Sequence, residues 1–177
     1  HPWIFQKLVE KPAVRPKPGS IVDVVGVEGD WIGRGFYNGH SRIAVRILES
    51  NPDIQVDAAW FTRKIGEAVH LRREVLQLDK VSDAWRVHSE GDGLSGLVVD
   101  RYADLLVVEF FSAGMFRHRE WIYDALREHF PGCRFHASAD EGKPQLISIA
   151  GIAGIGKSRL AWEFYKYFDG IVDTVWW

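Results

Sequence analysis

The segment 151–158 reads GIAGIGKS and has the residue types and spacing of a phosphate-binding loop. Glycines let the backbone N–H groups of such a loop turn towards a phosphate, and the N-terminus of a following helix favours the anion. Lys157 would reach the terminal phosphates of a nucleotide, and Ser158 would be a ligand of Mg²⁺. The residues predicted to bind nucleotide are Gly151, Gly154, Gly156, Lys157 and Ser158. The cofactor that this pattern predicts is ATP with magnesium.

The segments on either side of the loop suit this interpretation. Residues 145–150 are apolar and prone to form a strand, and residues 159–168 have a helical pattern, which is the order that the motif needs. In proteins that hydrolyse ATP, an Asp at the end of a later apolar strand usually supplies a second magnesium ligand. Only Ile171 to Asp173 comes close, and it follows the helix too soon. We therefore expect nucleotide binding without hydrolysis.

A second group of residues suits contact with RNA. The first fifty residues hold seven Lys or Arg and five Asp or Glu, a local excess of two positive charges. Cationic and aromatic side chains near Gly-rich turns could meet RNA phosphates and bases. The candidates are Arg34, Tyr37, His40, Arg42 and Arg46. The alternative interpretation is that alternate residues of the strands simply face solvent.

The composition is that of an ordinary folded protein. The chain has 177 residues, 46% of them hydrophobic and 26% charged, which suits one domain or two small ones. A net charge of −2 argues against attraction of the whole molecule to nucleic acid. Cys133 is the only cysteine, so we expect no intramolecular disulfide, no zinc site built on paired cysteines, and a cytoplasmic location. No membrane span or signal peptide is visible.

The spacing of apolar residues predicts the helices and strands that must position these groups. Residues 19–48 alternate between short apolar strands and Gly-rich turns, which indicates a small barrel or sandwich. Asp57 is a good N-cap, and apolar residues recur at helical spacing from there to about Leu78. The strand-like runs that follow are 85–88, 96–100 and 105–111. They predict a β meander.

A second helix is predicted from about Met115 to Phe130, where the sequence Pro131-Gly132 would end it. The last strand and helix of the chain cannot bury their own apolar faces, so they must pack on a neighbour. A hairpin between residues 134–137 and 146–150 would achieve this.

Several other residues have ordinary structural interpretations. The acidic segment Glu90–Gly93 is better explained as a turn between strands, because Asp-Gly suits positive φ, than as a catalytic or metal-binding loop. His118, His129 and His136 have no companions at ligand spacing, so no metal site is expected. The tryptophans expected in a core or interface are Trp60, Trp85, Trp121 and Trp162.

Three segments carry a resemblance to a known family: HPWIF at 1–5, GRGFYN at 33–38 with Ser41 and residues 43–46, and above all RVHSEGDGLSGLVVDRY at 86–102. They resemble the N-terminal half of S-adenosylmethionine-dependent large-subunit rRNA methyltransferases that make 5-methylcytosine. In that family a PUA domain, which is a small RNA-binding pseudo-barrel, precedes a β-rich domain with one helix and then a Rossmann-like methyltransferase domain.

The resemblance covers about residues 1–133 and implies RNA, rRNA in particular, as the partner. The family's cofactor pocket and catalytic cysteine belong to the Rossmann-like domain, which we expect to be absent, and Cys133 matches no position of their motif. We therefore expect no catalytic residue in this chain and no binding of S-adenosylmethionine.

The remainder, about residues 135–177, is similar to a different family. The run 142–163 and the aromatic-rich segment 164–168 resemble the opening of the AAA/STAND ATPase domain that follows the cyclase domain in some bacterial adenylate cyclase-like regulators. The two resemblances together imply a junction of two unrelated fragments, either a natural fusion or a constructed chimera. The junction would lie between Cys133 and Gly142.

The predicted fold class is α+β. It consists of a PUA-like β barrel at 1–56, a linking helix at 57–80, a β meander with one helix at 81–133, and a truncated terminal P-loop βα unit at 134–177. The predicted function is RNA binding without methyl transfer, and this needs no cofactor. Nucleotide binding through the phosphate loop is the alternative, and an inactive chimeric fragment is a third possibility.

Overall fold

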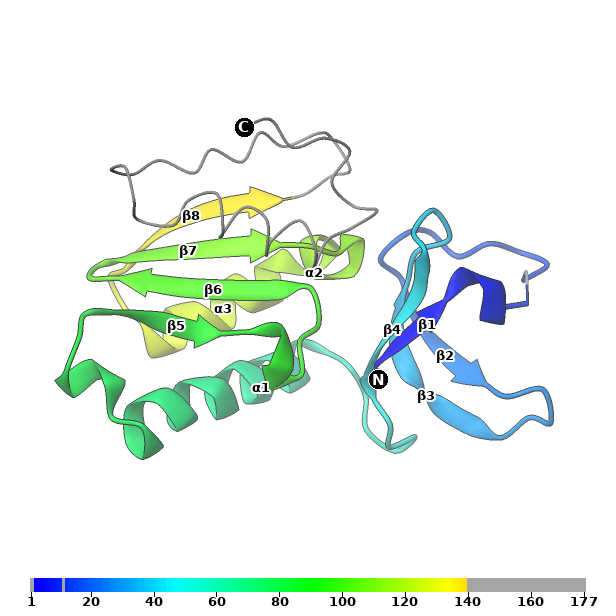
Figure 1. Cartoon of the computed structure of the whole chain (residues 1–177), viewed down its shortest axis with the longest axis horizontal. Coiled ribbons are helices and arrows are strands. Elements are labelled where there is room, and N and C mark those ends of the chain that lie inside the picture. The colour runs from blue at the N-terminus through cyan, green and yellow to red at the C-terminus, as the bar shows by residue number, and fades with distance from the viewer. Residues whose placement is uncertain (1, 11, 140–177) are drawn as a thin grey trace, which may run out of the picture. The chain divides into compact units, whose positions relative to one another are not determined.

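The computed structural model describes residues 2–10 and 12–139, whose strands form two sheets (Figure 1). Neighbouring strands of the first sheet are antiparallel and follow the order β1-β4-β3-β2. Its strands are β1 Trp3–Phe5, β2 Ile21–Val25, β3 Trp31–Tyr37 and β4 Ile43–Glu49. The predicted phosphate loop, the strand and helix beside it, and Trp162 lie outside the described residues.

The strands predicted between residues 21 and 48 are confirmed, and they belong to one sheet where a small barrel or sandwich was expected. β1 and β2 lie at the two edges of the first sheet and do not pair with each other, so the described strands form an open sheet. β1 has only three residues and pairs only with β4, with a register shift between Ile4 and Phe5.

Helix α1 (Ala58–His70) begins where the sequence predicts. Asp57 is its N-cap, because the carboxylate Oδ1 accepts a hydrogen bond from the backbone N–H of Trp60 at 2.9 Å. The chain then continues as a wider π-helical turn, Leu71–Val75, and leaves the helix at Gln77, whose φ of 53° is left-handed. The predicted linking helix is thus regular only in its first part.

The second sheet has the order β5-β6-β7-β8. Its strands are β5 Ala84–His88, β6 Leu97–Tyr102, β7 Leu105–Phe110 and β8 Arg134–Ala139. The first three form the predicted antiparallel meander, whereas β8 is parallel to β7. A parallel neighbour requires a crossover, which helices α2 (Ala113–Arg117) and α3 (Arg119–His129) provide. The predicted partner of β8 at 146–150 lies outside the described residues.

The single helix predicted from Met115 to Phe130 is in fact two helices. The break lies at His118, which has non-helical backbone angles of φ −103° and ψ 23°. Its Nδ1 lies 2.9 Å from the carbonyl oxygen of Gly114, and its ring stacks on Phe36 at 5.1 Å between centroids. Packing against β3 therefore decides the break, and the helical periodicity of the sequence contains no sign of it.

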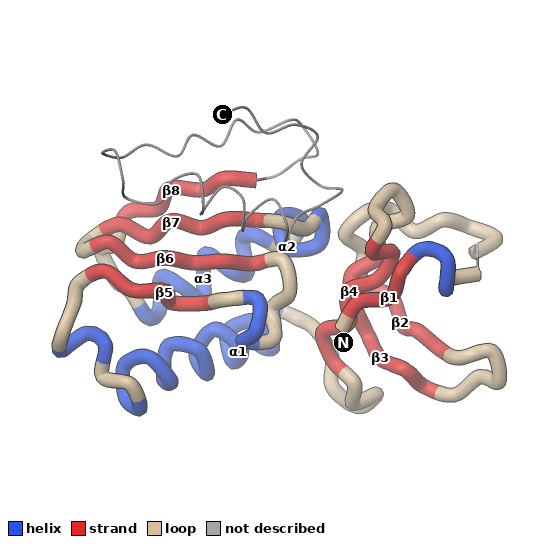
Figure 2. The backbone as a smooth tube through the Cα atoms, viewed as in Figure 1, coloured by secondary structure: helices blue, strands red, loops and turns tan. Residues whose placement is uncertain are grey.

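The main core lies between the second sheet and helices α1 and α3, which Figure 2 shows beside it. Trp60 and Trp85 are buried in this core, as predicted, and Trp121 packs against it. Phe36 of the first sheet also belongs to the core, where it packs on Gly114 of α2. The two sheets are therefore parts of one compact unit.

The segment Glu90–Gly93 is a turn between strands, as predicted. Residues Glu90–Asp92 form a single 3₁₀ turn (η4), and Gly93 has a φ of 102°. The Asp92 carboxylate accepts hydrogen bonds of 2.9 and 2.7 Å from the guanidinium of Arg72, so the acidic group is used to hold the turn against the π-helical segment.

Candidate functional site

Arg34, the first predicted RNA contact, is buried and fully paired. Its Nε and Nη2 donate to the two carboxylate oxygens of Asp23 at 2.6 and 3.1 Å, and its Nη1 donates to the carbonyl of Ile54 at 2.7 Å. The hydrogen bond from Arg34 holds the pKa of the Asp23 carboxyl below its usual value. This geometry ties β2, β3 and the loop after β4 together. RNA contact by Arg34 stays a prediction.

Arg46, the last predicted contact, is also largely buried. Its Nη1 donates to Ser95 Oγ at 2.8 Å and lies 3.8 Å from a carboxylate oxygen of Glu90. Its guanidinium lies over the ring of Trp3, 5.1 Å from the centroid. Burial lowers the pKa of Arg46. Arg46 thus joins the first sheet to the connection between β5 and β6.

The other three candidates lie together at one end of the first sheet. Tyr37 is the last residue of β3, and its side chain is buried. His40 and Arg42 are exposed in the turn 38–42 that leads into β4. The turn is held by hydrogen bonds, since the His40 N–H donates to Asn38 Oδ1 at 3.1 Å and the Asn38 N–H donates to the Ala44 carbonyl at 2.8 Å.

Two further segments meet at the same end. The 3₁₀ turn η1 (Gln6–Leu8) is bound to the 38–42 turn, because the Gln6 N–H donates to the Arg42 carbonyl at 2.9 Å. The loop 12–20 is bound to Tyr37 by two backbone hydrogen bonds of 2.7 and 2.9 Å. These two segments add Lys7, Arg15 and Lys17 to the predicted residues.

We call the group Lys7, Arg15, Lys17, His40 and Arg42 the cationic end. All five are exposed, and within the described part of the chain their side chains form no hydrogen bond or ion pair. Glu28 and Asp30 lie in the turn between β2 and β3, at the opposite end of the seven-residue β3. A strand of that length separates the two ends by roughly 20 Å. The five residues of the cationic end, with Glu10 among them, therefore lie far from these two acids.

Helix α2 borders the cationic end. At Gly19, where φ is 80°, an added Cβ would lie 2.6 Å from the Ala113 carbonyl oxygen and 3.2 Å from Arg117 Cβ. The loop 12–20 therefore packs directly on α2, and it does so at a residue that has to be glycine. This contact places Arg117, which is exposed, next to the loop 12–20.

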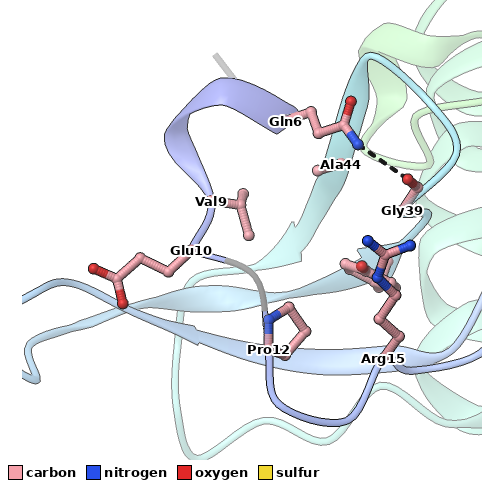
Figure 3. Close-up of a pocket in the computed structure, with 8 residues that line it drawn as sticks. Gln6, Val9, Glu10, Pro12, Arg15, Gly39 and Ala44 are labelled. Carbon is pink, nitrogen blue, oxygen red and sulfur yellow. Dashed lines mark hydrogen bonds between the residues drawn. The ribbon is translucent and has the colours of Figure 1, made fainter.

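A pocket of about 300 Å³ opens at the cationic end (Figure 3). It lies between η1, the 12–20 loop and the 38–42 turn. Its lining residues are Gln6, Val9, Glu10, Pro12, Arg15, Tyr37, Gly39 and Ala44. The Gln6 amide donates from Nε2 to the Gly39 carbonyl at 3.1 Å, which fixes its orientation across the opening.

Sequence reasoning missed Gln6, Lys7, Arg15 and Lys17. Cationic residues interspersed with prolines in the segment 12–18 are the signal that could have drawn attention to two of them. For Gln6, no pattern in the sequence was available.

The predicted absence of a metal site concerned three histidines. His118 stacks on aromatic rings of the core, and His129 and His136 lie on α3 and β8. Among residues 2–10 and 12–139, no three His, Cys, Asp or Glu side chains come together in a way that could hold a metal ion. In the same residues, no helix has the length and apolar character needed to cross a membrane.

Comparison with known proteins identifies the first part of the chain. Residues 1–50 match the model of a PUA-like domain. The chain is 36% identical over 155 residues to "Ribosomal RNA large subunit methyltransferase I" of Alteromonas mediterranea, which covers 88% of this chain and 39% of that protein. It is 39% identical over 131 residues to the protein of the same name from Pseudoalteromonas atlantica, which covers 74% and 33% respectively.

A solved structure supports the fold. A Streptococcus mutans protein assigned as a SAM-dependent methyltransferase matches with a TM-score of 0.61 at 13% identity, over 78% of this chain and 37% of that one. A methyltransferase assigned in the same way and complexed with SAH matches with a TM-score of 0.62 over 77% of this chain and 36% of its own. The mixed α/β fold is therefore shared with methyltransferase-type proteins.

The chain spans between a third and two fifths of the length of the curated relatives that it matches. An alignment that covers 88% of 177 residues has to extend beyond residue 150, and so past the segment 133–142 where the sequence predicts a junction. Homology to these rRNA methyltransferases is shown. The ATPase resemblance of residues 135–177 stays a prediction.

Proposed function

We propose that this chain is an RNA-binding part of an rRNA methyltransferase-type protein, and that the cationic end of the first sheet contacts the RNA backbone. The observation that carries the proposal is the grouping of exposed cations from three separate segments at one end of a PUA-like domain. A surface with unpaired Lys and Arg side chains suits RNA because binding releases the counterions that surround the phosphates. The net charge of −2 does not oppose this, since Glu10 is the one acid in the lining of the pocket at the cationic end, against four Lys and Arg there.

The described contacts divide the predicted residues into two groups. Arg42 and His40 present exposed side chains in a turn that hydrogen bonds hold in place. Arg34 and Arg46 each hold parts of the protein together, and their donors would have to break existing bonds to reach a phosphate. We therefore assign phosphate contact to Arg42, Arg15 and their neighbours, and a positioning role to the two buried arginines.

The number of cations sets the salt dependence that the proposal predicts. If the four Lys and Arg of the cationic end and Arg117 each neutralise one phosphate, the slope of log K against log salt for single-stranded RNA is about −3 to −4. Removal of one cation by Arg42→Ala should make the slope shallower by about 0.7 and weaken binding by roughly threefold to tenfold.

The test is a fluorescence anisotropy titration of structured rRNA fragments at several salt concentrations. Arg127→Ala is the control, because Arg127 is also exposed but lies on α3, where it forms an ion pair with Asp124 and lies over the rings of Tyr123 and Phe135. We expect Arg42→Ala and Arg15→Ala to weaken binding and Arg127→Ala to leave it unchanged. RNA binding that does not respond to salt, or equal losses in all three variants, would overturn the proposal.

A further inference from the structure

We propose that the pocket beside Tyr37 binds one unpaired base of the RNA, and that Arg15 at its rim binds the phosphate attached to that base. This inference rests on the proposed function and specifies which part of an RNA the cationic end recognises. Attraction between phosphates and cations alone would require neither the cavity nor the polar groups beside it.

The Gln6 amide supplies the groups that can read a base edge. One of its Nε2 hydrogens is used on the Gly39 carbonyl, which fixes the plane of the amide. Its second hydrogen and its Oε1 make no hydrogen bond within the described residues. An adjacent donor and acceptor in one fixed plane match the donor and acceptor pairs on the edge of a nucleobase.

The walls of the pocket suit the flat face of a base. Val9 and Pro12 supply apolar surface at the mouth of the pocket. Tyr37 and Ala44 lie beneath it as a fixed floor, since only 8% and 1% of these residues are exposed. Unpaired RNA bases are typically bound in this way, with a face against an aromatic or apolar side chain and an edge on a few polar groups.

Charge at the rim favours an anionic ligand. Figure 3 shows the Arg15 side chain extending towards Gly39, whereas the carboxylate of Glu10 points away from it. The Arg15 guanidinium has no ion pair or hydrogen bond in the described part of the chain, so all its donors are available. A base in the pocket would bring its own phosphate to this rim, where a guanidinium can bind it with two parallel hydrogen bonds.

The pocket is formed before the ligand arrives. The backbone hydrogen bond from Gln6 to Arg42 joins two of its walls. The third wall is Tyr37 of β3, which packs against the turn 38–42. A Cβ added to Gly39 of this turn would lie 2.5 Å from the Tyr37 hydroxyl. A site whose walls are already fixed loses little conformational entropy on binding.

The test compares a fully paired duplex with the same duplex carrying one bulged nucleotide, which adds a single phosphate. Because only an unpaired base can form hydrogen bonds with the free donor and acceptor of the Gln6 amide, we expect the wild-type protein to prefer the bulged RNA by roughly tenfold. Gln6→Ala should remove most of this preference and leave duplex affinity unchanged. Arg42→Ala should weaken binding of both RNAs by the same factor. Gln55→Ala, the matched control at an exposed glutamine outside the pocket, should keep the preference intact.

The outcomes separate this inference from the proposed function. Equal, salt-dependent binding of both RNAs by the wild-type protein would overturn the base pocket and leave the RNA-binding proposal standing. Failure to bind either RNA would overturn both. A free mononucleotide should compete only at about millimolar concentration, because one base and one phosphate make few contacts. Tight mononucleotide binding without preference for the bulge would mean a nucleotide site instead, and would refute the inference.

Discussion

His88 of β5 should make the stability of this protein sensitive to acid. The residue is completely buried, its Nδ1 lies 3.2 Å from the carbonyl oxygen of Leu97, and its Nε2 has no hydrogen-bond partner among the described residues. Burial lowers the pKa of His88 to about 4, and the nearby charges of Asp92 and Arg72 act on the pKa in opposite directions. The folded protein therefore contains the neutral imidazole at neutral pH.

The size of the effect follows from this pKa. Above pH 6.5 the imidazole is neutral in both states, and the contribution of His88 to stability is complete. As the pH falls from 6.5 to about 4, the unfolded chain binds a proton that the folded chain does not, so the free energy of unfolding decreases. The pKa gap corresponds to a loss of about 3 kcal/mol, which levels off below the folded pKa.

Urea unfolding, followed by tryptophan fluorescence between about pH 7.5 and pH 4, measures this loss. The comparison is His88→Asn, because asparagine keeps a donor near the Nδ1 position but does not titrate. The variant is less stable at neutral pH because it leaves a cavity. The stability difference between the two proteins should shrink by about 3 kcal/mol as the pH falls, since carboxylates titrate alike in both. A difference that stays constant across this range would refute the argument.

The other predictions concern packing, an ion pair and two ligands. Gly114→Ala should lower the free energy of unfolding by about 1–3 kcal/mol, measured by urea titration, because the new Cβ would overlap the ring of Phe36. Arg72→Met should lower the free energy of unfolding by about 1–3 kcal/mol, because it removes the cationic partner of the Asp92 carboxylate, which then keeps only its hydrogen bonds with Ser89. Full recovery in the double variant with Asp92→Asn would show that the loss comes from the unpaired charge. An unchanged free energy in the single variant would contradict the prediction. ATP with magnesium should bind the phosphate loop with a Kd of about tens of micromolar or weaker, and steady ATP turnover that Lys157→Ala abolishes would contradict the expectation of no hydrolysis. S-adenosylmethionine should give no binding heat in calorimetry, and a micromolar site would show the expectation to be wrong.

The sequence was sufficient for features that depend on near neighbours. The start of α1 was predictable because an N-cap is made within one turn, by Asp57 and the backbone of Trp60. The strands of the meander were predictable because apolar and polar residues alternate along a strand when one of its two faces is buried. Tyr37, His40 and Arg42 were found together for the same reason, since one turn and the end of one strand contain all three.

Tertiary structure decided which of the predicted arginines are available. By residue type and local pattern, Arg34 and Arg46 look the same as Arg42. Their partners come from elsewhere, since Asp23 lies on the neighbouring strand β2 and Ser95 lies 49 residues along the chain from Arg46. Alternation shows which residues share a face of a sheet, but whether that face meets solvent or another part of the protein depends on how the sheets and helices pack.

The pocket depended on tertiary structure even more strongly. Gln6 and Arg15 lie in a short turn and an irregular loop, where no hydrophobic period indicates the direction of a side chain. They reach the same cavity only because backbone hydrogen bonds attach each segment to the end of β3 or to the turn after it. The break at His118 has the same origin, because stacking on Phe36 overrides a helical pattern that continues through it. Local sequence thus determined which elements form, whereas contacts between distant segments determined which side chains are available to bind a ligand.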